Sequence, residues 1–203
     1  MQPFMTQERQ NDFDIPPHRG GLALEPVAWI DREFTFDLPV GAFLAVLERM
    51  RGTPVRASDL VSSASEELLS ARLNHKWSVK VHLGHLVDLH SLEEQRLREF
   101  MAGATMLSAA DPLNHATAIA GYDHVPIGTL LASLQVQRGE LVRKLEVLNS
   151  EDVQRSALHP RLQKPMRILD WAYFIAEHDD HHLAQARRTL IEARLRMKFR
   201  EEM

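Results

Sequence analysis

Residues 166–199 contain neither proline nor glycine, and their apolar side chains recur at the spacing of an α-helix. This pattern predicts one long helix. Inside it lies the segment His178-Asp179-Asp180-His181-His182. Residues four apart on a helix share a face, so His178 and His182 are expected to project together. The spacing therefore predicts a pair of imidazoles that could share one metal ion.

A metal site built on this pair needs a further ligand from elsewhere in the chain. A catalytic zinc-type centre has three protein ligands and an open position. The chain has no cysteine, so disulfides and thiolate ligands are excluded and every protein ligand must donate nitrogen or oxygen. Its eleven histidines are a generous supply of imidazole nitrogen.

The composition is that of an ordinary globular protein. At 203 residues, with 44% hydrophobic and 26% charged residues, the chain can bury one core. The net charge of −4 argues against general nucleic-acid binding. No apolar run is long enough for a membrane span, and residues 1–17 do not resemble a secretory signal. We therefore expect a cytoplasmic protein without nucleic-acid or membrane partners.

The fold class expected is all-α, a four-helix bundle with an irregular N-terminal extension. Residues 1–37 carry several prolines and glycines and are expected to pack on the body, while residues 38–203 form the bundle domain. Gly52-Thr53-Pro54 is expected to end the first helix, and the segment containing His159-Pro160 and Lys164-Pro165 is expected to be a loop. Helices are expected at residues 39–51, 54–72 (with interruptions), 78–101, 126–148 and 166–199.

The second long helix carries the candidates for a third ligand. Ser78 is a suitable N-cap for it, and His82 and His85 lie three residues apart within it. His85 lies in a mostly apolar stripe with Leu89 and Leu92, which favours a position facing the bundle interior. In bundles, metal sites are commonly built from side chains of facing helices. His85 is thus the preferred third ligand.

These segments together resemble a known family. The matching motifs are Trp77-Ser78-Val79, Gly84-His85-Leu86, residues 96–100 and residues 177–185. They are similar to those of the DinB-like superfamily of four-helix-bundle proteins, which includes metal-dependent hydrolases. The resemblance covers roughly residues 37–190, and the first 35 or so residues have no counterpart.

The resemblance implies a site, a class of activity and an assembly. It implies a divalent metal held by His85, His178 and His182, and the all-histidine donor set leaves zinc and nickel both open as that metal. Family members with assigned activities resemble hydrolases and thiol-dependent transferases, which implies a small-molecule substrate and in some cases a low-molecular-weight thiol cofactor. Family members also resemble homodimers.

Asp179 is the candidate catalytic residue. The pattern His178-Asp179-x-x-His182 resembles the zincin motif, in which a glutamate at that position is the general base. Aspartate is one methylene shorter and would reach less far. The alternative is that Asp179 is a helix-surface carboxylate, or one that orients a ligand histidine.

Other residues are expected around the metal rather than on it. His181 points about 100° away from His182 on the helix and is expected to support the site or lie on the surface, although His178 and His181 at i,i+3 could also chelate a metal. The long connection at residues 103–125 is of a length that is often functional. The remaining candidates for supporting or pocket residues are His82, Asp88, Tyr122, His124 and His159.

The sequence thus favours a three-His metalloprotein that acts as a metal-dependent hydrolase or thiol transferase on a small molecule. The alternative is a non-enzymatic, stress-related bundle that binds metal or ligand, or a dimer scaffold. An enzyme needs an exchangeable position on the metal, a metal-binding protein tolerates a closed coordination sphere, and a dimer scaffold does not need the three histidines.

Overall fold

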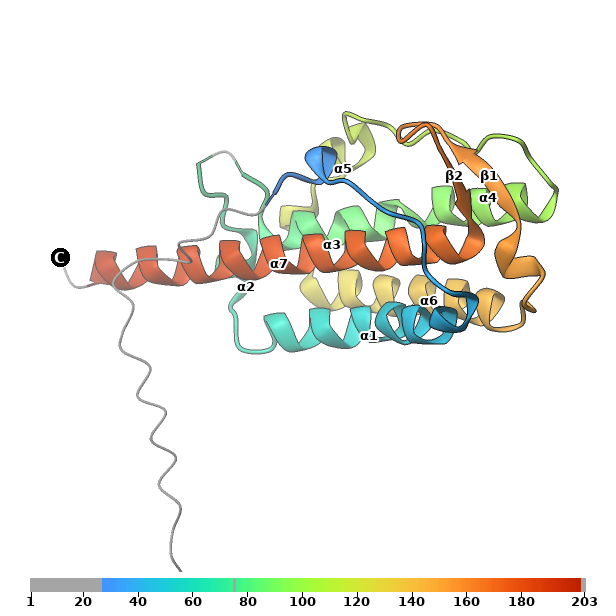
Figure 1. Ribbon diagram of the computed structural model, residues 1–203. Coiled ribbons are helices and arrows are strands. Elements are labelled where there is room, and N and C mark those ends of the chain that lie inside the picture. The colour runs from blue at the N-terminus through green and yellow to red at the C-terminus, as the bar shows by residue number, and fades with distance from the viewer. Residues whose placement is uncertain (1–26, 75, 202–203) are drawn as a thin grey trace, which may run out of the picture.

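The computed structural model describes residues 27–74 and 76–201, and this part of the chain is mostly helical (Figure 1). The long helices are α1 (Phe43–Val61), α3 (Val79–Asp88), α4 (His90–Met101), α6 (Ile127–Glu146) and α7 (Ile168–Glu201). Short helices and turns are η1 (Trp29–Asp31), η2 (Val40–Ala42), α2 (Glu66–Ser70), α5 (His115–Ile119), η3 (Tyr122–His124) and η4 (Asp152–Gln154). One hairpin is formed by β1 (Ser156–His159) and β2 (Lys164–Arg167).

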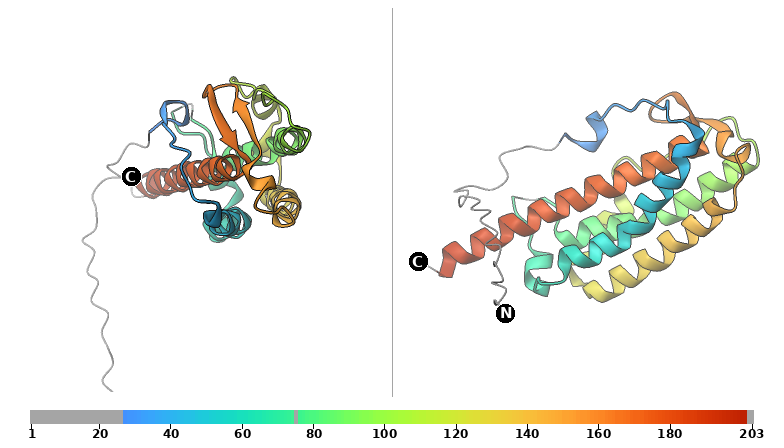
Figure 2. Two further views of the ribbon diagram at one scale, coloured as in Figure 1. Left: turned by 45° about the vertical axis from the view of Figure 1, so that its right-hand side comes forward. Right: turned by 60° about the horizontal axis from the view of Figure 1, so that its bottom comes forward.

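Four helical rods form the bundle, which confirms the predicted fold class (Figure 2). The α1 helix packs against α6 and α7, and α3 packs against the same two helices from the other side. Helices α3 and α4 together make one rod, divided only at Leu89. The long helix α7 thus lies between α1 and α3, where its side chains can meet both.

Several predicted boundaries are confirmed. The side chain of Ser78 accepts a hydrogen bond from the backbone N–H of Val81, so it caps α3 as predicted. Gly103, with φ of +73°, follows the end of α4, in the left-handed conformation that glycine adopts readily. Helices α6 and α7 also lie where apolar spacing predicted helices, at residues 126–148 and 166–199.

The prediction that Pro54 ends the first helix is wrong. Helix α1 continues through Pro54 to Val61. Proline removes one backbone donor and disfavours a helix interior, but Thr53 and Ala57 on this stretch are fully buried against the bundle. Tertiary packing therefore outweighs the local preference.

The segment before the last helix is also not the loop that was expected. Residues 156–159 and 164–167 pair as an antiparallel hairpin, with Leu158 opposite Pro165. The backbone of Leu158 also bonds to Thr105 and Leu107 in the connection after α4. These bonds join two connections into a cover over the amino-terminal half of α7 (Figure 1).

The described part of the N-terminal extension runs along α7. Residues 32–39 form neither helix nor strand, and Phe34 is buried against Phe174 with a ring separation of 5.0 Å. Trp29 also packs on Phe174, at 4.9 Å. The part of the expected extension before residue 27 lies outside the described residues.

The interior consists of two apolar clusters separated along α7 by a polar layer. The first cluster includes α7 residues up to Ala176, and the second includes α7 residues from Leu183 onward. Between them lie His178, Asp179 and His182, all with exposed fractions of 9% or less. Buried polar side chains need partners, so this polar layer is the candidate functional site.

Within the described residues, no helix has the combination of length and hydropathy that crossing a membrane requires.

Candidate metal centre

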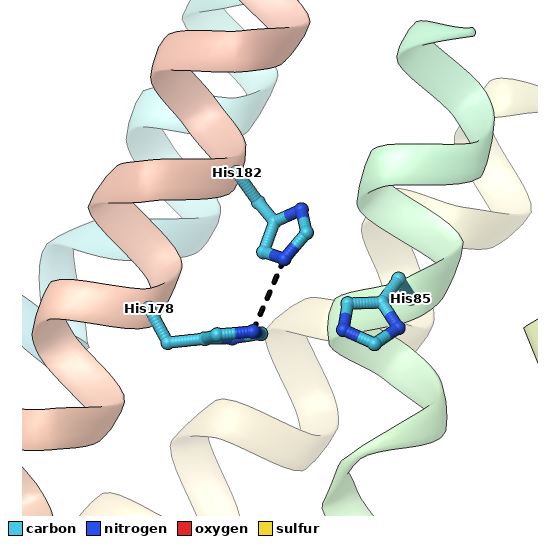
Figure 3. Close-up of side chains that lie close together, drawn as sticks. All are labelled: His85, His178 and His182. Carbon is cyan, nitrogen blue, oxygen red and sulfur yellow. Dashed lines mark hydrogen bonds between the residues drawn. The ribbon is translucent and has the colours of Figure 1, made fainter. Parts of the chain in front are cut away.

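Three histidines from two helices meet in the polar layer. His178 and His182 stand one turn apart on α7, and His85 faces them from α3 (Figure 3). One ring nitrogen from each residue lies within 4.8 Å of the others. Their exposed fractions are 5% for His85, 9% for His178 and 7% for His182. The structure therefore brings together the three residues expected to be ligands.

The spacing of the nitrogens suits a shared cation. The Nε2 atoms of His178 and His182 are 3.1 Å apart. Two nitrogens bound to one tetrahedral zinc ion at about 2.0–2.1 Å lie roughly 3.3 Å apart. The pair thus needs little movement to bind one ion.

Neighbouring side chains orient the other ring nitrogen of two candidate ligands. Nδ1 of His85 lies 3.0 Å from Oγ1 of Thr117, and Thr117 donates in turn to Asp88 at 2.6 Å. The same carboxylate accepts from the hydroxyl of Tyr122. Because Thr117 donates its proton to Asp88, its oxygen accepts from Nδ1–H of His85, which leaves Nε2 as the free donor atom of that ring.

His82 has the corresponding place beside His182. The Nδ1 atoms of the two rings are 3.0 Å apart, so one donates and the other accepts. If Nδ1–H of His182 is the donor, its Nε2 carries the lone pair that faces His178. His82 and Asp88 thus lie where residues supporting the ligands were expected.

All these imidazoles are held neutral. Burial lowers the pKa of His82 to about 3 and that of His85 to about 4. Burial, together with the neighbouring histidines, also places the pKa values of His178 and His182 well below the usual range. Only a neutral imidazole has a lone pair to offer, so the site is ready to bind a metal ion near neutral pH.

The metal-free protein is expected to lose stability as the pH falls below about 6.5. Histidines in the unfolded chain take up protons there, whereas buried His82 stays neutral until about pH 3. Each such residue contributes stability that is present above the unfolded pKa and decreases by about 1.4 kcal/mol per pH unit below it. Denaturant unfolding between pH 7.5 and 5 measures this slope.

The control for this prediction compares two variants. Replacing His82 by asparagine should make the slope shallower by up to one proton, whereas the same change at the exposed His115 removes no buried imidazole and serves as the control. Identical slopes for wild type and the His82 variant would contradict the expected burial effect.

Two tryptophans border the three histidines. The ring of Trp29 lies 4.7 Å from His178, and that of Trp77 lies 5.1 Å from His85 and 5.9 Å from His182. Both indoles are half-buried. Trp77 therefore borders the site together with Trp29 of the N-terminal extension.

Tyr122 packs directly on the backbone of α3. A Cβ atom at Gly84 would lie 2.3 Å from the ring of Tyr122, so no larger residue fits at position 84 without moving that ring. The glycine before His85 thus allows the tyrosine to approach Asp88. Tyr122 thus reaches Asp88, the partner of Thr117, from the long connection.

The structure does not support a catalytic role for Asp179. Its side chain is fully buried, and its two oxygens accept hydrogen bonds from Arg138 of α6 and Thr53 of α1, each at 2.8 Å. Both partners belong to helices other than α3, which carries His85. Asp179 thus lies in a buried interhelical ion pair, neither on the helix surface nor bonded to one of the three histidines in the described residues.

The remaining candidates differ in position. His181 is half-buried, with its ring 5.2 Å from His182 and 5.7 Å from Trp29. His124 is exposed and makes no described contact with the three histidines. His159 is 3% exposed, and its ring lies 5.2 Å from that of Phe174. Phe174 precedes His178 by one turn of α7. His181 and His159 thus flank the site, and His124 does not.

One groove on the surface is separate from this centre. It encloses about 390 Å³ between α4 and the end of α6, and none of the predicted site residues lines it. Its lining residues are Glu94, Leu97, Arg98, Met101, Lys144 and Leu148.

Sequence reasoning missed Thr117 and Trp29. Neither belongs to a motif, and both come from segments with no regular pattern. The length of the connection at residues 103–125 was the one signal that pointed toward Thr117.

Comparison with known proteins identifies the family. The sequence model of the DinB superfamily matches residues 49–186, more than half of the chain. Among solved structures, the fold is similar to YfiT from Bacillus subtilis, with a TM-score of 0.69 and 17% identity over 82% of this chain and 94% of that chain. YfiT is described as "a probable metal-dependent hydrolase with an unusual four-helix bundle topology". No curated protein matches the sequence. The bundle, its three facing histidines and the family match together show that this chain belongs to the DinB superfamily.

Proposed function

We propose that this protein is a metalloenzyme that binds one divalent metal ion through His85, His178 and His182 and hydrolyses a small-molecule substrate. The observation that carries the proposal is the convergence of three buried, neutral imidazoles from two facing helices. The described function of YfiT, a structural neighbour, agrees with this proposal.

The donor set fits a catalytic rather than a closed structural site. Three protein ligands leave a fourth position open, as in catalytic zinc centres. Neutral nitrogen donors suit zinc or nickel and suit calcium much less. When bound, the metal would act as a Lewis acid that lowers the pKa of water or of a thiol.

The side chains around the site have separate tasks. Thr117 and Asp88 hold the ring of His85 in one tautomer, and His82, bonded to Nδ1 of His182, orients that ring. Trp29 and Trp77 restrict access of water from two sides. His181, half-buried beside His182, is positioned to move a proton at a ring nitrogen.

Thiol transfer is the second candidate. Three neutral ligands leave the ion its full positive charge, which favours an anionic fourth ligand such as a thiolate. The chain contains no cysteine, so the thiol would come from a small molecule. A requirement for added thiol separates this reaction from hydrolysis.

The test is turnover by metal-loaded protein with panels of esters, amides and electrophiles, with and without low-molecular-weight thiols. Wild type is expected to turn over at least one class, and His85→Ala is expected to fall to the uncatalysed rate because one ligand is lost. His115→Ala is the matched control, because its exposed side chain pairs with Asp111 and makes no described contact with the three histidines. Equal turnover by wild type and His85→Ala would refute the proposal, and bound metal without turnover would favour the non-enzymatic alternative.

A further inference from the structure

His159, at the end of β1, carries a buried donor without an acceptor. Its Nδ1 accepts a hydrogen bond from the backbone N–H of Leu162 at 3.2 Å. Burial and two neighbouring cations lower the pKa of His159 to about 4, so the ring is neutral and its proton must be on Nε2. Among the described residues, no acceptor meets this Nε2. A buried N–H without a partner is costly and calls for an oxygen ligand.

Neither of the two cations near His159 forms a direct ion pair within the described residues. Glu99 and Glu93 act on Arg96 at longer range, whereas no described carboxylate acts on Arg161. Arg96, 6% exposed, donates from Nε and Nη2 to the carbonyl of Ser108 at 2.9 and 2.8 Å. Arg161 makes one long bond, 3.3 Å, to the carbonyl of Ile30. Burial lowers the pKa of both guanidinium groups.

This cluster lies beside the three histidines. The guanidinium of Arg161 lies over Phe174 at 5.7 Å and over Trp29 at 6.0 Å from the ring centres. Phe174 precedes His178 by one turn of α7, about 6 Å along the axis. Trp29 contacts both of these α7 residues. A small molecule could therefore span from the cluster to the metal centre.

We propose that His159, Arg96 and Arg161 form a subsite for an anionic group of the substrate, a carboxylate or a phosphate, whose reacting group lies at the three histidines. The inference rests on the proposed function and adds the class of substrate to it. It combines a fixed N–H donor with two cations at one end of the same interior. An oxyanion satisfies all three groups.

A bound water is the simplest alternative occupant, and it is the weaker one. A water molecule could accept from Nε2–H of His159 but would not compensate the partly buried charge of Arg161, on which no described carboxylate acts. The guanidinium of Arg161 uses one of its five N–H donors, so its planar fork remains free for an oxyanion. Arg161 is exposed enough to reorient when a ligand enters.

The test is calorimetric titration of metal-loaded protein with benzoate, phenyl phosphate and the neutral benzamide. Arg161→Met is expected to weaken binding of the preferred anion by about 10- to 100-fold, the value of one charged hydrogen-bonded contact, and to leave benzamide binding unchanged. The preference between the two anions identifies the oxyanion. Arg161→Lys keeps the charge but not the planar fork, so its affinity for the anion should lie between those of wild type and Arg161→Met.

The control is Arg187→Met, an exposed arginine nearer the other end of α7, with the same change in net charge. Equal anion affinity in wild type and Arg161→Met, equal loss in Arg187→Met, or no preference for the anions over benzamide would each overturn the subsite. The same titrations on metal-free protein separate the two proposals. An effect of Arg161→Met in a protein that takes up no metal would leave the subsite standing and refute the metalloenzyme.

Discussion

Replacing His178 by alanine is expected to abolish stoichiometric metal binding. Wild type should bind about one equivalent, and the variant should lose more than about 100-fold in affinity, because changes even in residues that only orient a ligand cost about 10- to 100-fold. His178 and His182 form the close pair of the site, with Nε2 atoms 3.1 Å apart. Elemental analysis and competition with a chromophoric chelator measure both quantities.

The control must show that the variant loses a ligand and not its fold. His115→Ala removes an exposed histidine that pairs with Asp111 and makes no described contact with the three histidines, so it should keep full metal content. Circular dichroism of metal-free His178→Ala should match that of metal-free wild type, since the substitution leaves a small gap and exposes no charge. Full metal content in the variant would show that these histidines are not the ligands.

Replacing Arg138 by methionine is expected to destabilise the fold by about 3–5 kcal/mol, the cost of leaving buried carboxylates without their cation. Arg138 is 2% exposed and donates to Glu93 at 2.9 Å and to Asp179 at 2.8 Å. Thr53 also donates to Asp179. The cluster joins α1, α4, α6 and α7 between the two apolar clusters. Denaturant unfolding of the metal-free protein measures the loss.

Two further variants make this prediction specific. Arg143→Met removes an exposed arginine from the same helix and should change stability by less than about 0.5 kcal/mol. Combining Arg138→Met with Glu93→Met and Asp179→Leu removes all three charges and should recover most of the loss. If the triple variant also keeps its metal, Asp179 acts only in the fold; if the single variant is as stable as wild type, the cluster does not hold the helices together.

The helical part of this fold was predictable because its signals are local. Apolar spacing of 3.6 residues marked the last helix, and the hydroxyl of Ser78 marked the start of α3. The same period placed His178 and His182 on one face before any tertiary contact was known.

Two local rules failed where tertiary contacts opposed them. Helix α1 passes through Pro54 because burial of Thr53 and Ala57 outweighs the missing donor. The hairpin at residues 156–167 contains Pro160 and Pro165, which suggested a loop, yet its backbone also bonds to the connection after α4. Pairing between distant segments leaves no periodic mark in a sequence.

The sequence by itself determined the bundle, the histidine pair, and His82 and His85 as the candidates for the third ligand. Each of these follows from the direction of side chains along a single helix. Only the tertiary structure decided how these helices are rotated against one another. That rotation turns His85 toward the pair, turns Asp179 toward Arg138, and brings Thr117 and His159 from irregular segments to the same polar layer and its border. Such contacts depend on packing between segments far apart in the chain, which no local pattern encodes.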